Sequence, residues 1–252
     1  MSRTKSIAII SDIHGNFTAL NKVLKEIEMY GDEISDIMCL GDLVGYNPEP
    51  EKCVNKIRKV CSKVIAGNHD KAMVGELNTD WFRHSVKKSI SWTQKHLSDS
   101  SKSYLRSLNT REDIEIKGNK IILAHGSPDK DAPFTYIFNK YDVQNIEPLI
   151  MNTNILFIGH THVPFCLYND GEGWKNITKS NIDIDPDNNY VINVGSVGQP
   201  RDRDPRASFV IYHPEENIIN FKRIEYDIKE VQEKFTETDL PDEFSRRLAQ
   251  GR

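Results

Sequence analysis

Long hydrophobic runs are absent from this sequence. The opening residues lead into only four consecutive apolar residues, Ile7 to Ile10. The core of a secretory signal needs about 7–15 apolar residues, and a membrane-spanning helix needs about 20. We therefore expect a cytoplasmic protein that has no membrane partner.

Cysteine is scarce, and no pattern pairs the few cysteines present. The chain has four in 252 residues, irregularly spaced and without a C-x-x-C pair: Cys39, Cys53, Cys61 and Cys166. A disulfide framework normally shows a dense and regular spacing. We therefore expect reduced thiols with a structural role.

An excess of one charge is also lacking. Lys and Arg total 33 against 37 Asp and Glu, which gives a net charge of −4 with no block of like charge. Proteins that bind nucleic acids or anionic membranes usually carry a basic patch or stripe. No stable nucleic-acid partner is expected, and the oligomeric state stays open.

What the sequence does contain is a set of short apolar runs that stop abruptly on polar residues. The central example is the run before Gly41-Asp42, which ends on a carboxylate. Because ligands gather outside the carboxyl ends of strands in open α/β sheets, we expect the polar groups at these ends to surround Asp42. The other ends read Asp12-x-His14, Gly67-Asn68-His69-Asp70, His125-Gly126 and Gly159-His160-Thr161-His162.

The first third of the chain alternates strand and helix patterns. Strands are predicted over 7–10, 34–40 and 63–66, with amphipathic helices over 17–27 and 48–60. Short connections between such units favour right-handed crossovers and a parallel sheet. Residues 73–109 then form a helical excursion that we expect beside the ligand-bearing face.

Strands return later, with a different spacing. Short strands are predicted over 114–117, 120–124 and 155–158, followed by a meander at 165–168, 174–177, 190–194, 207–212 and 218–224 that is typical of antiparallel pairing. Parallel units early and hairpins late indicate two mixed sheets packed face to face with helices outside. Residues 227–252 are predicted to be a helical flap on one domain, 1–252.

The donors at the strand ends are too many for one metal ion. One divalent ion takes roughly four to six ligands, whereas two ions that share a bridging carboxylate can use all seven. Imidazole mixed with carboxylate and amide oxygen favours Mn, Fe, Zn, Co or Ni over Ca or Mg, and Mn is our choice. The seven predicted ligands are Asp12, His14, Asp42, Asn68, His125, His160 and His162.

Two metals about 3.5–4 Å apart suit hydrolysis at phosphorus, because together they hold an attacking hydroxide and polarise the ester oxygens. His69 follows the predicted ligand Asn68 directly, so crowding keeps it from the same ion and leaves it free to face the substrate. We assign His69 as the general acid or electrostatic partner of the leaving oxygen, with Asp70 to orient it. Asn68 is expected to contact substrate as well.

Taken in order, D-x-H, G-D, G-N-H-D, H-G and G-H-T-H resemble the motifs of the calcineurin-like metallophosphoesterase superfamily. The resemblance covers residue 7 to about 212. The loop 195–202 and the run 41–46 resemble its small prokaryotic phosphodiesterases. It implies a four-layer α/β/β/α sandwich. It also implies one metal on Asp12, His14 and His162, another on Asn68, His125 and His160, and Asp42 on both.

Two positions depart from the family, and two interpretations stay open. Ala66 stands where protein Ser/Thr phosphatases carry Arg, and Gly45-Tyr46 replaces their Asp-Arg-Gly, which disfavours a phosphoprotein substrate. Arg201 either contacts phosphate or belongs to a solvated loop. The aromatic residues are interpreted as packing, with a base-binding pocket as the alternative: Trp81, Phe82, Trp92, Tyr104, Phe134, Tyr136 and Phe138.

The motifs together predict a metal-dependent phosphoesterase that acts on diesters. Its expected partner is a small organic phosphate or a nucleotide. A phosphomonoesterase, including a phosphoprotein phosphatase, is the alternative within enzymes. An interaction scaffold with the same fold is the alternative from another class, and the complete ligand set with His69 present disfavours it.

Overall fold

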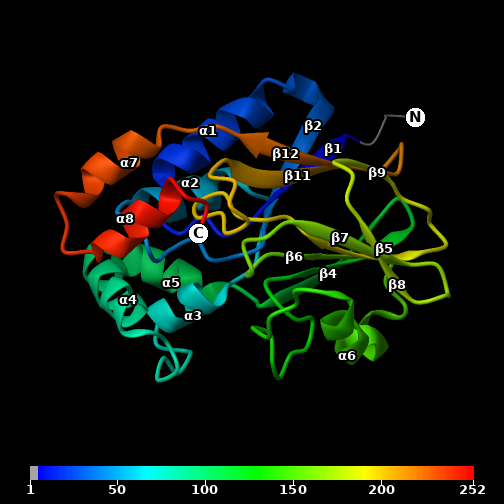
Figure 1. Ribbon diagram of the computed structural model, residues 1–252, viewed down its shortest axis with the longest axis horizontal. Helices are drawn as coiled ribbons and strands as arrows, with labels where there is room; N and C mark the ends of the chain where they lie inside the picture. The colour runs from blue at the N-terminus through cyan, green and yellow to red at the C-terminus, as the bar shows by residue number, and fades with distance from the viewer. Residues whose placement is uncertain (1–4) are drawn as a thin grey trace.

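Two six-stranded mixed sheets form the centre of the molecule (Figure 1). The computed structural model describes residues 5–252. Residues 1–4, which belong to the predicted domain 1–252, lie outside the described part. The described residues form eight α-helices around the sheets, so the predicted α/β class with two mixed sheets is confirmed.

The first sheet contains the N-terminal strands. Strands β1, β2 and β3 pair in parallel, as the early strand and helix pattern predicts. On the other side of β1, the sheet continues with antiparallel strands. Its order is β3 (Lys63–Val64), β2 (Ile34–Cys39), β1 (Ser6–Ile10), β11 (Ala207–His213), β12 (Ile218–Ile224) and β9 (Asn181–Asp183).

The second sheet is parallel at its centre and antiparallel at both edges. Strand β10 pairs in parallel with β6 and antiparallel with β7, so the prediction of a wholly antiparallel meander is wrong at this strand. The order is β4 (Arg111–Ile116), β5 (Asn119–Ala124), β6 (Ile155–Ile158), β10 (Asn189–Asn193), β7 (Phe165–Asn169) and β8 (Trp174–Ile177).

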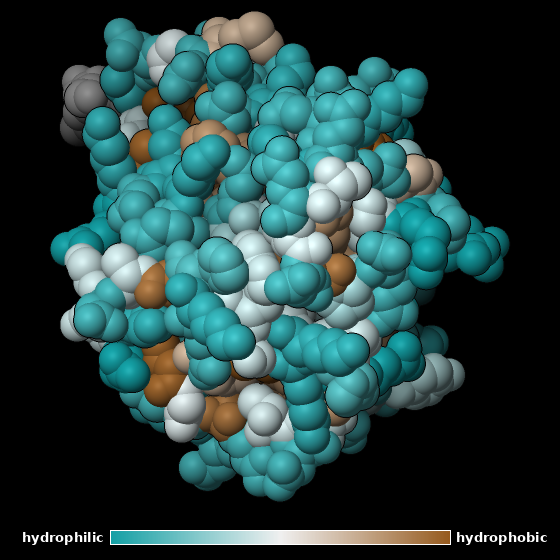
Figure 2. Space-filling model, turned by 90° about the vertical axis from the view of Figure 1, so that its left-hand side faces the viewer, coloured by the Kyte–Doolittle hydropathy of each residue, from teal (hydrophilic) through white to brown (hydrophobic). Residues whose placement is uncertain are grey.

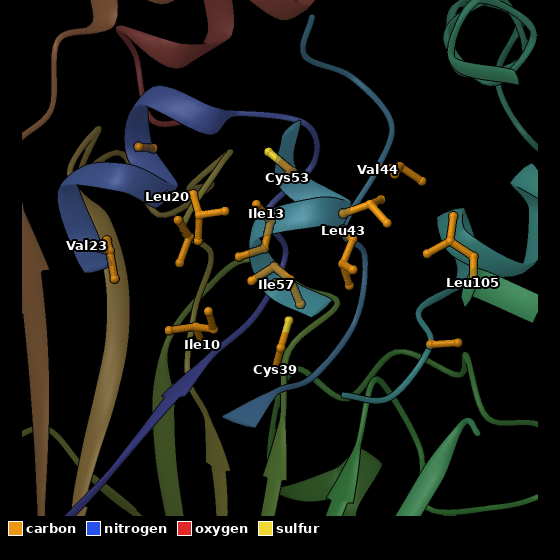
Figure 3. Close-up of a cluster of buried hydrophobic side chains, with 14 of the residues drawn as sticks. Ile10, Ile13, Leu20, Val23, Cys39, Leu43, Val44, Cys53, Ile57 and Leu105 are labelled. Atoms are coloured by element: carbon orange, nitrogen blue, oxygen red, sulfur yellow. The ribbon is translucent and has the colours of Figure 1, made fainter. Parts of the chain in front are cut away.

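The layers follow from the alternation of side chains along the strands. On β1, Ile9 packs between the two sheets with Phe157 and Tyr212. Its neighbour Ile10 points the other way, into the layer under α1 (Phe17–Glu28) and α2 (Pro50–Val60), where Leu20 also lies (Figure 3). Helix α6 (Lys140–Ile150) covers the outer face of the second sheet. The result is the predicted four-layer α/β/β/α sandwich.

The helical excursion lies beside the first sheet, as α3 (Asn68–Met73), α4 (His84–His96) and α5 (Asp99–Ser107). It begins earlier than the predicted residue 73, because Asn68 and His69 already form the first turn of α3 and β3 is only two residues long. Three elements were not predicted: α6, the three-residue strand β9 and the short 3-10 helix η1 (Gly31–Glu33).

Two further expectations concern cysteines and membranes. All four cysteines are free thiols, as predicted. Over residues 5–252, every helix is too short or too polar to cross a bilayer. The side of the molecule on the left of Figure 1 is covered mainly by hydrophilic side chains, with hydrophobic residues confined to small patches (Figure 2).

The C-terminal helices α7 (Ile228–Phe235) and α8 (Asp242–Leu248) pack through a separate hydrophobic group, the flap cluster. Its centre is Phe244, which is fully buried and meets the ring of Tyr46 edge-on at 4.9 Å between centroids. The predicted helical flap is therefore anchored to the loop that follows β2. Its buried members are Tyr46, Val231, Phe235, Leu240, Phe244 and Leu248.

Replacing Phe244 with alanine is expected to lower the free energy of unfolding by about 3 kcal/mol, because the change removes a buried ring and leaves a cavity. Phe138→Ala is the matched control, since Phe138 is 55% exposed. Urea denaturation followed by circular dichroism measures both. Equal midpoints for the two variants would show that the flap cluster does not contribute to stability.

Candidate functional site

The predicted metal ligands meet at one edge of the sandwich. Asp12 and His14 follow β1, and Asp42 follows β2 of the first sheet. His125 follows β5, and the loop after β6 carries the other two histidines of the second sheet. All seven predicted side chains are buried, with at most 3% exposure: Asp12, His14, Asp42, Asn68, His125, His160 and His162.

Two groups of ligand atoms share Asp42. Its carboxylate lies with Asp12, His14 and His162 in one group, and with His125 and His160 in the other, and the atoms of each group lie within 4.8 Å of one another. Asp42 Oδ2 is 3.5 Å from His14 Nε2 and 3.2 Å from His125 Nε2. The motif resemblance likewise gives Asp42 to both sets of ligands, and it adds Asn68 to the second.

Backbone carbonyls orient the four histidines. The Nδ1 atoms of His14, His125 and His162 lie 3.0, 2.8 and 2.5 Å from carbonyl oxygens of Val44, Leu40 and Gln199. In His160 it is Nε2 that lies 3.0 Å from a carbonyl, that of Phe134. A ring nitrogen that donates to a carbonyl leaves the other nitrogen unprotonated and ready to bind a cation. Each carbonyl therefore fixes one ring nitrogen, and the second nitrogen of each ring is the one left to bind a cation.

Charge states at the centre also suit a cation. Burial alone would raise the pKa of Asp42, yet the imidazoles of His125 and His69 hold it well below its usual range. Burial lowers the pKa of His14, and lowers that of His160 to about 3. Burial also acts on His125, but the Asp42 carboxylate raises its pKa to about 9. Because ligands bind deprotonated, a cation would displace that proton from His125.

Several polar atoms at the centre lack a hydrogen bond. Asp12 Oδ1, Asn68 Oδ1 and His125 Nε2 are buried and accept or donate no hydrogen bond within the described part of the chain. Buried polar atoms are normally satisfied, and oxygen with imidazole nitrogen is a donor set for borderline divalent ions. The residues therefore fit one or two transition-metal ions, with the unpaired Asn68 Oδ1 as a further oxygen donor.

The backbone at the centre is strained. Asp12, His14, Asp42, His160 and His162 all have φ between +50° and +65°, a region that residues other than glycine seldom adopt. Such strain concentrates at functional sites, where the surrounding fold imposes it. Here it turns several ligand side chains toward one point.

The glycines of the motifs allow chain segments to approach closely. A Cβ on Gly67 would lie 2.0 Å from Asp42 Oδ1, and one on Gly159 would lie 2.4 Å from Asp12 Oδ2. Real Cβ atoms do not come this near, so only glycine fits beside the ligands. Close packing against the ligand side chains therefore requires the glycine that begins G-N-H-D and the one that begins G-H-T-H.

His69 lies next to the predicted ligands and faces a cavity. It is 4% exposed, its backbone N–H donates to Asp42 Oδ1 at 2.8 Å, and its ring lines the cavity together with Asn68. Its Nδ1 has no hydrogen-bond partner among residues 5–252. Burial lowers the pKa of His69 to about 4, opposed by the Asp42 charge, so the neutral ring is the form present at pH 7.

Asp70 does not orient His69 as predicted. Its two oxygens accept the backbone N–H groups of Leu43 and Gly67, each at 2.9 Å. Burial and the nearby charge of Asp42 raise the pKa of Asp70 to about 7. The side chain points back toward the start of α3 and ties it to the loop after β2, so Asp70 positions the two loops that carry Asp42 and Asn68.

Arg201 points into the same cavity as His69. Its guanidinium lies over the ring of Tyr46, 5.4 Å from the centroid, and donates to Gln199 Oε1 at 2.8 Å. It forms no ion pair with any residue that the structure describes. A guanidinium held by neutral partners keeps its charge available for a phosphate.

Some site residues were missed in the sequence. Asn193 is fully buried at the end of β10, and its Nδ2 donates to the Gly159 carbonyl at 2.6 Å, which fixes the loop of His160 and His162. Its place at a strand end was a usable signal. Arg83 and Arg247 also line the cavity, and no local pattern distinguishes them from surface arginines.

The comparisons with known proteins agree with this geometry. The family model of the calcineurin-like phosphoesterase superfamily domain matches residues 6–217. An uncharacterized protein of Methanocaldococcus jannaschii is 38% identical over 246 residues, which are 98% of this chain and 98% of that protein.

Two solved structures share the fold over their full length. A metallophosphoesterase from Sphaerobacter thermophilus has a TM-score of 0.85 and 35% identity, over 99% of this chain and 100% of the other. A hypothetical protein from Pyrococcus horikoshii has a TM-score of 0.80 and 22% identity, over 99% of each chain. This chain therefore belongs to the calcineurin-like phosphoesterase superfamily.

Proposed function

We propose that the protein is a phosphodiesterase that uses two divalent transition-metal ions, with Mn²⁺ as the first choice, and that it hydrolyses a small organic phosphate or a nucleotide. The observation that supports this most directly is the shared carboxylate of Asp42, which belongs to both groups of ligand atoms. A cavity lined by Asn68, His69 and Arg201 opens beside it. The predicted cytoplasmic location stays a prediction.

Asp12, His14, Asp42 and His162 would hold one ion, and Asp42, Asn68, His125 and His160 the other. When bound, such ions supply Lewis-acid polarisation of the phosphoryl group and increase the acidity of water near phosphorus. The burial of all seven side chains excludes bulk water from the ligand atoms, which strengthens electrostatic interactions there.

Two side chains of the cavity act on the substrate itself. Arg201 binds phosphoryl oxygens through its guanidinium, which offers two parallel N–H donors. His69 donates its ring N–H to the leaving oxygen, which gains negative charge as the P–O bond breaks. Tyr46 supports both, because its ring lies 4.6 Å from the His69 ring and beneath Arg201.

The test is hydrolysis by metal-stripped protein that is separately reconstituted with Mn, Ni, Zn, Fe or Mg. We expect a nitrophenyl diester to be cleaved faster than the corresponding monoester, and Mn to restore activity that Mg does not. Faster cleavage of the monoester or of a phosphopeptide would replace the proposal with a phosphomonoesterase or phosphoprotein phosphatase. Metal binding with no hydrolysis of any ester would support the scaffold alternative.

Arg201→Ala is expected to raise KM about ten-fold or more while metal content stays unchanged, because a hydrogen bond to a charged group is lost and a guanidinium cannot bind a cation. Arg106→Ala is the control, since Arg106 is an exposed arginine on α5. Steady-state kinetics and elemental analysis give both quantities. Wild-type KM and kcat in Arg201→Ala would place Arg201 in a solvated loop.

A further inference from the structure

The cavity beside the metal ligands extends well beyond them. It has a volume of about 610 Å³, within the range of about 300–1,000 Å³ that is usual for small-molecule sites. Four of the eleven described residues that line it are arginines and none is acidic. The ions and Arg201 suffice to bind one phosphoryl group at the metal centre. The other three arginines of the cavity are not needed to bind a single phosphate.

The arginines of the cavity are poorly neutralised. Arg83 and Arg201 form no ion pair with any of residues 5–252, and Arg247 has only a long contact of 3.6 Å with Glu243, a partly exposed carboxylate. Unpaired guanidinium groups around a concave surface raise the local concentration of anions. The cavity is therefore suited to a ligand with more negative charge than one phosphate carries.

Aromatic rings form another part of the wall. Trp81 is 58% exposed and meets the buried Phe82 edge-on at 4.2 Å between centroids. Tyr136 is 40% exposed and stacks on His160 at 3.9 Å. Exposed ring faces next to cationic groups are the usual platform for a planar base.

These walls come from segments added to the sandwich. Trp81 and Arg83 lie between α3 and α4 of the helical excursion, and Arg247 lies on α8. Residue 247 is outside the part that the family model matches, residues 6–217. The flap cluster, through Phe244 and Tyr46, holds α8 against the loop that carries Asp42. The excursion and the flap therefore both contribute side chains to the wall of the cavity.

We propose that the substrate carries an aromatic ring and at least two phosphate groups, the chemistry of a nucleoside polyphosphate. This rests on the proposed phosphoesterase function. One phosphate lies at Asn68 and His69, the next lies between Arg83 and Arg247, and the ring packs on Trp81. Hydrolysis places the hydroxyl of a water molecule on the first phosphorus and breaks its P–O bond to the next phosphate, whose bridging oxygen leaves and takes the remaining proton of that water.

The test is isothermal titration calorimetry of the protein at one fixed Mn²⁺ concentration with ADP, AMP, adenosine and pyrophosphate. We expect ADP to bind about ten-fold or more tightly than AMP, because the second phosphate gains charge-assisted hydrogen bonds. Pyrophosphate should bind more weakly than ADP, since it lacks the ring, and adenosine should bind weakest of the four.

Variants test which residues bind the second phosphate and the aromatic ring. Arg83→Gln and, independently, Arg247→Gln should each weaken ADP about ten-fold and AMP far less. Trp81→Ala should weaken ADP and AMP alike and leave pyrophosphate unchanged. Arg58→Gln is the control, because Arg58 lies on α2 over Tyr104 and does not line the cavity. Thermal denaturation confirms that each variant is folded.

Equal affinity for ADP and AMP, or arginine variants that match Arg58→Gln, would overturn the assignment. The outcome is separable from the proposed function, which depends on cleavage of the nitrophenyl diester. A protein that cleaves that diester but does not distinguish ADP from AMP remains a phosphodiesterase with another substrate. A protein that shows the ADP pattern but cleaves no ester has this binding site without the proposed activity.

Discussion

Replacing Asp42 with alanine is expected to abolish activity and remove metal ions together. Among residues 5–252, Asp42 is the only carboxylate that belongs to both ligand groups. Its loss would remove an anionic ligand from both proposed ions and leave two cations facing each other without a shared charge. Because loss of one stabilising group typically costs about 10²–10³ in kcat, we expect a loss of at least that size. Asp42→Asn should be nearly as damaging, since an amide carries no charge.

The measurement combines elemental analysis of the purified variant with kinetics on a nitrophenyl diester. Asp187→Asn is the matched control, because Asp187 is exposed and far along the chain from every ligand motif. The control should keep wild-type metal content and turnover. Two ions per chain with normal turnover in Asp42→Ala would exclude the bridging role.

His69→Ala should keep its metal ions and lose roughly 10²–10⁴ in kcat, the range typical of proton-transfer groups. The loss should depend on the leaving group. An alkyl or ribose oxygen leaves as a strong base and needs a donor, whereas nitrophenolate is a stable anion and needs little help. The neutral form of His69 that its low pKa favours still offers a ring N–H to that oxygen.

The experiment compares kcat for an alkyl diester and a nitrophenyl diester, with metal content checked in each preparation. His84→Ala serves as the control, since His84 is an exposed histidine at the start of α4. Equal losses on the two esters would reject a donor role at the leaving oxygen. A variant without metals would instead place His69 among the residues that assemble the metal centre.

Backbone contacts at Asp42 link the loop after β2 to the loop after β3. Asp42 adopts φ of +52° and its Oδ1 accepts the backbone N–H of His69. Asp70 ties Gly67 to Leu43 in the same region. The loops after β2 and β3 therefore behave as one unit, and Asp42→Asn, which preserves an oxygen acceptor, separates the loss of charge from the loss of this contact.

The candidate metal ligands could be located in the sequence because each lies within a few residues of a strand end. A strand that stops on Asp12, Asp42 or His125 places its polar group at the sheet edge by local geometry alone. The pairing of the early strands was predictable for the same reason, since short strand and helix units permit few topologies. Helix α6 was missed although its capping box at Asn139 and Asp142 was a readable signal.

Only the tertiary structure decided what surrounds those ligands. The carbonyls that orient the histidines, such as Leu40 for His125, are up to 85 residues away along the chain. Asp70 accepts hydrogen bonds from backbone amides, and does not orient His69, because the start of α3 lies against the loop after β2. Arg83 and Arg247 line one cavity because Val86 and Trp92 of α4 pack against the flap cluster, to which α8 belongs. Such contacts depend on packing between distant segments, which periodicity and motif spacing do not encode.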